Sequence, residues 1–260
     1  MNPGIIASWP LGGGPPPPVV YTPPNSANLR YWYKTDEEVY SDVAGTTLCA
    51  DGDGAANWKN WGLSEDAIQT TSANRPTYKT GGLAGRPYLS LDRAVAQFFE
   101  NLLDCDQPGG ILGHNKLTFA AVFSHLNIAG GSNPILMAAG STDKARVEVL
   151  DNGAGVPRLS WWKSQVLQDD AAMLDPCSVI GTVRTISTFD RNINGTNTTQ
   201  SQSTNASPRV GNTSTEFLRR TQNGSYFTGR LYEFMYWNTN LAYTSSIDDV
   251  RAYFASKYGI

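Results

Sequence analysis

The stretch RLYEFMYW, from Arg230 to Trp237, holds eight residues of which only Arg230 and Glu233 are charged. Successive residues of a strand point to opposite faces, so a strand with this sequence is apolar on both faces. Such a strand normally lies in the centre of a sheet that is covered on both sides. A carboxylate buried there needs hydrogen-bond partners. The stretch therefore predicts a central strand with Glu233 bonded inside the core.

Outward from this stretch, short apolar or alternating runs continue from Tyr31 to Tyr236, separated by clusters of Gly, Asn, Asp, Pro and Ser. The clearest other runs are Leu117 to Phe123, Pro134 to Ala139, Arg146 to Leu150, and Val183 to Phe189. This pattern is typical of an all-β domain. The dipeptide Asn194-Gly195 is the strongest hairpin signal, because a type I′ turn needs positive φ at both central residues.

Only the carboxyl end has a helical pattern. Ser245 can cap a helix start, the carboxylates of Asp248 and Asp249 suit its first turn, and Gly259 can end it. Three apolar residues fall three and four positions apart and share one face: Ile247, Val250 and Phe254. We expect that face to close the sandwich.

The amino-terminal segment differs from the rest. Residues 1–29 contain eight Pro and four Gly, and the first charged side chain is Arg30. This composition predicts an extended arm over residues 1–28, attached to a sandwich domain over residues 29–260. The arm has more apolar residues than a tether needs, and these are candidate partner-binding residues: Ile5, Ile6, Trp9, Leu11, Val19, Val20 and Tyr21. A flexible linker is the alternative.

Composition excludes several classes of protein. The 260 residues suit one large domain, and 20 Lys plus Arg against 23 Asp plus Glu leave no basic excess for nucleic acid. We expect no signal peptide and no membrane span, since no run of about 18 apolar residues occurs. The three cysteines lie far apart, without zinc or redox spacing, and are expected to be small apolar fillers: Cys49, Cys105 and Cys177.

The sequence offers little catalytic chemistry. Its acidic residues cluster as sequence neighbours, which point to opposite faces of a strand, and its only histidines are His114 and His125. We therefore expect no enzyme, no cofactor and no catalytic metal. Asp51-Gly52-Asp53-Gly54 leaves two interpretations, a calcium loop or a tight turn. The missing third ligand favours the turn.

Aromatic residues are abundant, with 7 Trp, 12 Tyr and 9 Phe. If the adjacent pair Trp161-Trp162 lies on a strand, one ring points outward. That ring is a candidate glycan platform, because aromatic faces stack on sugar C–H surfaces. Core packing or a protein interface is the alternative use of these rings.

Six segments form a recognisable set: WKNWG at 58–62, DAIQ at 66–69, NRPTY at 74–78, GRPYLSLD at 85–92, GRLYEF at 229–234 and the closing YFASKYGI at 253–260. Together they resemble the concanavalin A-like, laminin-G-like jelly-roll domains of phage virion and bacterial surface proteins. The resemblance implies two packed antiparallel sheets of about six or seven strands each. The chain departs from the family's pattern at Asn60, where an Asp is common, and at Asp92-Arg93, where Asp-Gly is common. It also lacks the Glu-x-Asp-x-Glu strand of glucanases on this fold.

Three functions follow as hypotheses. The first is a structural protein of a tailed bacteriophage virion, a decoration or appendage subunit. Its arm would dock on the capsid or tail, other virion proteins would be its partners, and it would be a homo-oligomer or part of a larger assembly. The second is a glycan-binding module for attachment to a host or surface. The third is a depolymerising enzyme, which a cleft with paired carboxylates would favour.

Overall fold

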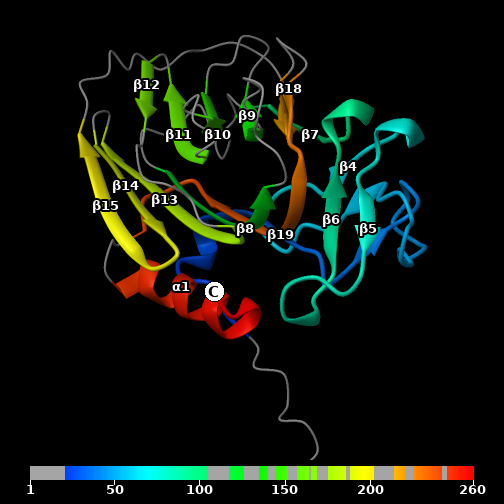
Figure 1. Ribbon diagram of the computed structural model, residues 1–260, viewed down its shortest axis with the longest axis horizontal. Helices are drawn as coiled ribbons and strands as arrows, with labels where there is room; N and C mark the ends of the chain where they lie inside the picture. The colour runs from blue at the N-terminus through cyan, green and yellow to red at the C-terminus, as the bar shows by residue number, and fades with distance from the viewer. Residues whose placement is uncertain are drawn as a thin grey trace, which may run out of the picture.

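The computed structural model describes residues 21–104, 117–125, 135–139, 145–151, 157–163, 165–168, 175–185, 188–201, 214–220, 225–241 and 245–260. They form an all-β sandwich with one carboxyl-terminal helix, as predicted (Figure 1). In these ranges, no helix has both the length and the apolar character needed to cross a membrane.

Two antiparallel sheets make up the sandwich. The eight-stranded sheet has the order β15 (Thr196–Ser201), β14 (Thr188–Ile193), β13 (Cys177–Thr185), β8 (Leu117–His125), β19 (Gly229–Trp237), β6 (Tyr88–Leu91) and β5 (Thr77–Lys79), with β1 (Leu29–Lys34) also paired to β19. The nine-stranded sheet has the order β12 (Gln165–Gln168), β11 (Pro157–Lys163), β10 (Ala145–Asp151), β9 (Ile135–Ala139), β16 (Ser214–Phe217), β7 (Phe99–Asp104), β4 (Ala67–Ile68), β3 (Asn57–Trp58) and β2 (Val39–Tyr40). Both sheets are larger than the six or seven strands that the family resemblance implied.

The remaining elements are short. Strands β17 (Arg219–Arg220) and β18 (Ser225–Tyr226) form a two-stranded ribbon. Single 3₁₀ turns lie at η1 (Ser26–Asn28), η2 (Ser72–Asn74), η3 (Leu83–Gly85) and η4 (Arg93–Val95).

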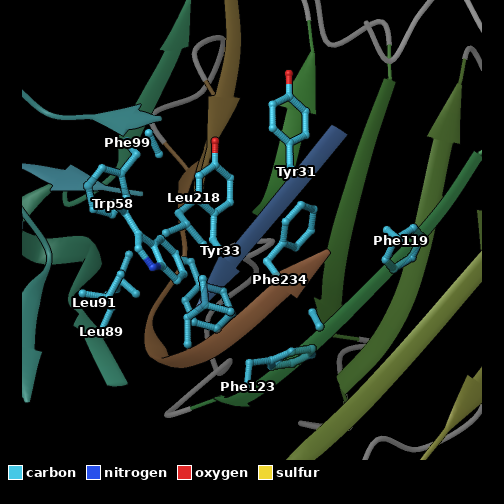
Figure 2. Close-up of a cluster of buried hydrophobic side chains, with 14 of the residues drawn as sticks. Tyr31, Tyr33, Trp58, Leu89, Leu91, Phe99, Phe119, Phe123, Leu218 and Phe234 are labelled. Atoms are coloured by element: carbon cyan, nitrogen blue, oxygen red, sulfur yellow. The ribbon is translucent and has the colours of Figure 1, made fainter. Parts of the chain in front are cut away.

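Strand β19 is central and buried along its length except at Arg230, as its sequence predicts. One apolar cluster packs between the two sheets, and Figure 2 shows Phe234 of β19 there with Trp58 and Phe99 of the nine-stranded sheet. A second cluster fills the opposite face of β19, with Tyr232, Met235 and Trp237, beneath helix α1. Both faces of the strand are therefore covered.

Helix α1 (Ser245–Tyr258) begins and ends where the sequence predicts, and Gly259 follows it with a φ of 74°. Ile247, Val250 and Phe254 are buried on one face, against the eight-stranded sheet. The helix thus closes that side of the sandwich, which confirms the expectation for its apolar face (Figure 1).

The Asn194-Gly195 hairpin is confirmed, with φ values of 44° and 86° between β14 and β15. The expected single strand from Val183 to Phe189 is wrong, because Val183 pairs with Phe189 across β13 and β14. That stretch contains no Gly, Pro, Asn or Asp to mark a reversal. The alternation of apolar residues therefore gives no sign that one strand ends and the next begins within this stretch.

Candidate functional site

The segment from Asn60 to Ser64 lies along β1 and is fixed to it by its backbone. Trp61 N donates to Trp32 O at 2.9 Å, and Leu63 N donates to Leu29 O at 3.0 Å. A Cβ on Gly62 would lie 2.5 Å from the carbonyl oxygen of Arg30, which no real Cβ does. Gly62 therefore allows the close approach of the two backbones.

The side chain of Asn60 locks this segment in place. Its Oδ1 accepts hydrogen bonds from Trp32 N and Gly62 N, both at 2.8 Å, and its Nδ2 donates to Arg30 O at 2.9 Å. Its backbone N–H donates to Asp66 Oδ1 at 2.9 Å. An aspartate cannot donate to Arg30 O. The departure from the family's Asp at this position therefore has a structural reason.

Lys34, at the end of β1, contacts both the buried Trp32 and the exposed Trp61. Its Nζ lies 4.3 Å from the centre of the Trp32 ring and 4.1 Å from the centre of the Trp61 ring. Both distances suit a cation–π contact. The same ammonium lies 2.8 Å from Glu37 Oε2, and the Lys34 side chain is only 7% exposed.

Trp61 contrasts with the other described tryptophans. It is 44% exposed, whereas Trp32, Trp58 and Trp237 are buried. Leu63, two residues further on, is 59% exposed. Trp61 is therefore an aromatic side chain that remains in solvent while its backbone bonds and the Lys34 contact hold it against β1.

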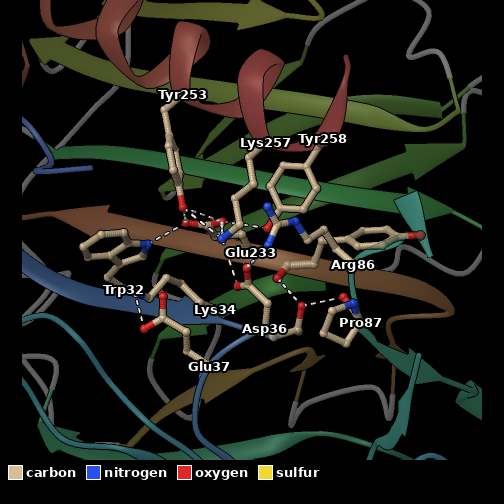
Figure 3. A network of polar contacts seen from close by, with 12 residues as sticks. Trp32, Lys34, Asp36, Glu37, Arg86, Pro87, Glu233, Tyr253, Lys257 and Tyr258 are labelled. Atoms are coloured by element: carbon tan, nitrogen blue, oxygen red, sulfur yellow. Dashed lines mark hydrogen bonds and ion pairs between the residues drawn. The ribbon is translucent and has the colours of Figure 1, made fainter. Parts of the chain in front are cut away.

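Glu233 lies on the face of β19 that also carries Met235 and Trp237, the face covered by α1. Leu231 pairs with Phe123 of β8 and Glu233 pairs with Val122, so Tyr232 is an extra residue in the strand. This β-bulge lets Tyr232 lie on the same face as its neighbour Glu233. Figure 3 shows its carboxylate between Trp32 of β1 and three side chains of α1: Tyr253, Lys257 and Tyr258.

The buried carboxylate of Glu233 is fully bonded. Trp32 Nε1 donates to Oε1 at 2.6 Å, Tyr258 OH donates to Oε2 at 2.7 Å, and Lys257 Nζ lies 2.9 Å from Oε2. Tyr253 OH donates to the same carboxylate at 2.9 Å. The expectation that Glu233 has partners in the core is confirmed. Burial raises the pKa of the Tyr253 and Tyr258 hydroxyls well above the usual value, and the negative charge of Glu233 adds to the effect.

Asp36 and Glu233 share the ammonium of Lys257, at 2.9 Å from each. The other oxygen of Asp36 lies 3.1 Å from Arg86 Nη1. Each of the four carboxylate oxygens therefore already has a protein donor, and Glu233 is 0% exposed. This arrangement ties α1 to the sheet.

The Asp51 and Asp53 carboxylates hold a turn. Asp51 Oδ1 accepts from Thr80 N at 2.8 Å, and Asp53 Oδ2 accepts from Ala50 N at 2.8 Å. Lys79 lies 3.7 Å from the other oxygen of Asp51. These bonds account for the Asp-Gly-Asp-Gly loop as a tight turn. Among the described residues, no group of three or more His, Cys, Asp and Glu is placed to hold a metal ion.

Two of the three cysteines lie in the described part of the chain, and both are free thiols. Burial raises the pKa of Cys49 to about 12, with a further contribution from Asp53, and burial also raises the pKa of Cys177. A thiol with a raised pKa is a poor nucleophile at neutral pH. The expectation of small apolar fillers is confirmed for both, since Cys177 is buried in the core and Cys49 is half-buried against it.

The candidate partner-binding residues lie outside the described residues except Tyr21. The Tyr21 ring stacks on Tyr253 of α1 with a centroid distance of 3.9 Å and packs edge-on to Trp32 at 6.1 Å. Further along, Pro24 O accepts from Trp237 Nε1 at 2.9 Å. Residues 21–28 thus pack on the sandwich.

The other candidate glycan residues, Trp161 and Trp162, lie in strand β11, paired with Val147 and Arg146 of β10. Their side chains lie outside the described part of the structure. The sequence interpretation missed Trp61 as a surface residue. Its neighbours Asn60 and Gly62 were the available signal, since both residue types favour loops.

No protein-family model matches the chain, and no curated protein matches it. Solved structures do. The fold is similar to domain 4 of AbnA, an extracellular GH43 arabinanase from Geobacillus stearothermophilus solved with arabinotriose, with a TM-score of 0.52, 13% identity, and coverage of 85% of this chain and 98% of that domain. It is also similar to a GH54 α-L-arabinofuranosidase soaked with a cyclic sulfate inhibitor, with a TM-score of 0.57 and 8% identity.

The second match covers 81% of this chain and 52% of the arabinofuranosidase, so the chain spans about half of that protein. At such low identities these similarities show the fold alone. They establish a jelly-roll-like β-sandwich, of the architecture found in domains of carbohydrate-active proteins.

Proposed function

We propose that this chain is a glycan-binding module that acts without catalysis and holds sugar on the exposed face of Trp61. The observation that carries the proposal is the contrast between a solvent-exposed indole and its rigid support. Trp61 is 44% exposed, while Asn60, Lys34 and the backbone of β1 fix its position. A preorganised ring loses little entropy when a sugar stacks on it.

The fold adds support. Domain 4 of the arabinanase, which has the same architecture over nearly its whole length, was solved with arabinotriose. The state of the acidic residues supports a role without catalysis. A glycosidase needs two carboxylates that face a substrate. Here Asp36 and Glu233 share the ammonium of Lys257, and their carboxylate oxygens already contact donors of the protein.

A panel of immobilised oligosaccharides tests the proposal. The wild-type chain should bind at least one member, and Trp61→Ala should weaken that binding about tenfold or more, equivalent to about 1.4 kcal/mol. Leu48→Ala is a matched control, because Leu48 is also exposed, at 62%, and lies in another segment. Binding that survives Trp61→Ala but is lost in Trp161→Ala or Trp162→Ala would move the site to β11. Hydrolysis of a bound oligosaccharide would contradict the non-catalytic role.

A second proposal concerns residues 1–20 of the predicted arm. We propose that this segment binds another protein of a phage particle, where the sandwich would be displayed. The attachment of residues 21–28 supports this idea, because Tyr21 stacks on Tyr253 of α1 and Pro24 bonds to Trp237, which ties the residues that follow this segment to the sandwich. Removing residues 1–20 should leave a folded sandwich that no longer co-sediments with particles. Unchanged co-sedimentation would contradict it.

A further inference from the structure

One lysine–carboxylate pair contacts Trp61, and a second lies in the same segment of the chain. Lys34, whose ammonium lies over the Trp61 ring, pairs with Glu37 at 2.8 Å. Lys59, two residues before Trp61, lies 3.5 Å from Asp66. The Trp61 surface, formed by the Trp61 ring and these two pairs, therefore carries charges of both signs that already face each other.

The first pair presents mainly its acceptor to solvent. The Glu37 side chain is 41% exposed, whereas that of Lys34 is 7% exposed. The Lys34 ammonium is also occupied by the rings of Trp32 and Trp61. A ligand at this point meets a carboxylate that can accept hydrogen bonds, while the cation behind it is covered.

The second pair presents mainly its donor. The Lys59 side chain is 44% exposed and that of Asp66 is 25% exposed. One oxygen of Asp66 already accepts a bond from Asn60 N at 2.9 Å, which holds this carboxylate near the backbone. A ligand at this point meets an ammonium that can donate hydrogen bonds.

We infer that the Trp61 surface selects uncharged oligosaccharides and discriminates against acidic ones; this inference rests on the proposed glycan-binding function. A hydroxyl both donates and accepts. Sugar hydroxyls therefore suit a surface that offers the Glu37 acceptor and the Lys59 donor around a stacking ring. A sugar carboxylate accepts only, and it would meet like charge at Glu37 and Asp66.

An acidic sugar would also compete with protein carboxylates for both cations of this surface. Both lysines of the Trp61 surface already face a carboxylate, so a uronate would have to compete with Glu37 or Asp66 for its cation. Replacing one ion pair by another leaves the number of ion pairs unchanged, and the carboxylates of Glu37 and Asp66 repel the approaching anion.

The experiment is a titration with matched neutral and acidic ligands. Cellotriose and its 6-carboxylated (glucuronic acid) counterpart share linkage and ring size, and a wider set of neutral oligosaccharides with their uronic acid counterparts extends the comparison. We expect the wild-type chain to bind the neutral member of a pair at least tenfold more tightly than the acidic one. Glu37→Gln and Lys59→Gln should each weaken neutral binding about threefold to tenfold. Asp248→Asn, an exposed change on α1, should have no effect.

The possible results separate this inference from the function on which it rests. No binding of any saccharide would contradict the proposed function itself. Tighter binding of the acidic members, lost in Trp61→Ala, would leave the function standing and overturn the selectivity. A wild-type oligomer that Trp61→Ala dissociates would show that a second copy of the chain covers this surface, which would also overturn the inference. Lys59→Gln keeps the Asp66 to Asn60 hydrogen bond, so an unchanged unfolding midpoint shows that its effect is local.

Discussion

The ammonium of Lys34 lies 4.1 Å from the centre of the Trp61 ring and 4.3 Å from the centre of the Trp32 ring. Trp32 in turn donates its indole N–H to Glu233, which binds three side chains of α1. One continuous set of contacts therefore runs from the closing helix through β1 to the exposed indole, and Figure 3 shows its part from α1 to Lys34. This connection explains how a surface tryptophan is held without being buried.

Lys34→Met should lower the free energy of unfolding by about 1–2 kcal/mol, because it removes a partly desolvated cation between two aromatic rings. It should also increase the mobility of Trp61, measured by indole relaxation in NMR. Lys79→Met is the control. Lys79, the last residue of β5, lies 3.7 Å from Asp51 of a turn, and both side chains are exposed. Lys79→Met should therefore change the free energy of unfolding by less than about 0.5 kcal/mol. Equal effects of the two variants would contradict the role given to Lys34.

Glu233→Gln should lower the free energy of unfolding by more, about 3 kcal/mol, because it removes one partner of a buried ion pair. The ammonium of Lys257 then loses one of its two carboxylates. Chemical denaturation measures the change. Asp248→Asn removes the carboxylate of an exposed pair with Arg251 on the same helix and should cost little. A loss below about 1 kcal/mol for Glu233→Gln would show that this network does not hold α1 on the sheet.

Alkaline pH should destabilise the fold through Tyr253 and Tyr258. Their pKa values are raised above 10.0 in the folded state by burial and by Glu233, so the unfolded state loses these protons first. Stability from this source is complete below about pH 10 and is lost as the pH rises above that value. The double variant Tyr253→Phe/Tyr258→Phe should flatten the fall in unfolding free energy between about pH 9 and 11. An unchanged slope would contradict the assignment.

Asn60→Asp should destabilise the chain by about 1–3 kcal/mol, because the new carboxylate cannot donate to Arg30 O and leaves that carbonyl without this bond. The Asp66 carboxylate, bonded to the backbone N–H of the same residue, adds repulsion. Thermal unfolding measures the loss. Asn74→Asp, on an exposed 3₁₀ turn, should be nearly neutral. A stable Asn60→Asp variant would mean that the amide does not fix the Trp61 segment.

Local patterns predicted much of the fold. Arg230 to Trp237 is apolar on both faces, which predicted a central strand, and the spacing of Ile247, Val250 and Phe254 predicted the helix face that packs on the sheet. Asn194-Gly195 predicted its hairpin because the backbone requirement of that turn is local. These features depend on neighbours within a few residues, so the sequence contains their signals.

The candidate site could not be predicted in the same way. Trp61 is exposed because the segment after Asn60 lies along β1, about thirty positions earlier in the chain. Alternation along β19 puts Glu233 on the same face as Met235 and Trp237, but its partner Trp32 comes from β1, about two hundred positions earlier in the chain. Both features depend on pairing between distant segments. The glycan hypothesis for Trp161 and Trp162 stays a prediction, because their side chains lie outside the described residues, while the described tryptophan side chain that lies in solvent is Trp61.

The central claim is that a neutral sugar stacks on Trp61. The most direct measurement follows the indole N–H signals of the 7 tryptophans in ¹⁵N–¹H NMR spectra while a neutral oligosaccharide that binds the chain is added. Trp61→Phe assigns the signal of Trp61. We expect that signal to shift in a saturable way, while the signals of the buried Trp32, Trp58 and Trp237 change little. Saturable binding with the Trp61 signal unmoved and another indole shifted would contradict the account.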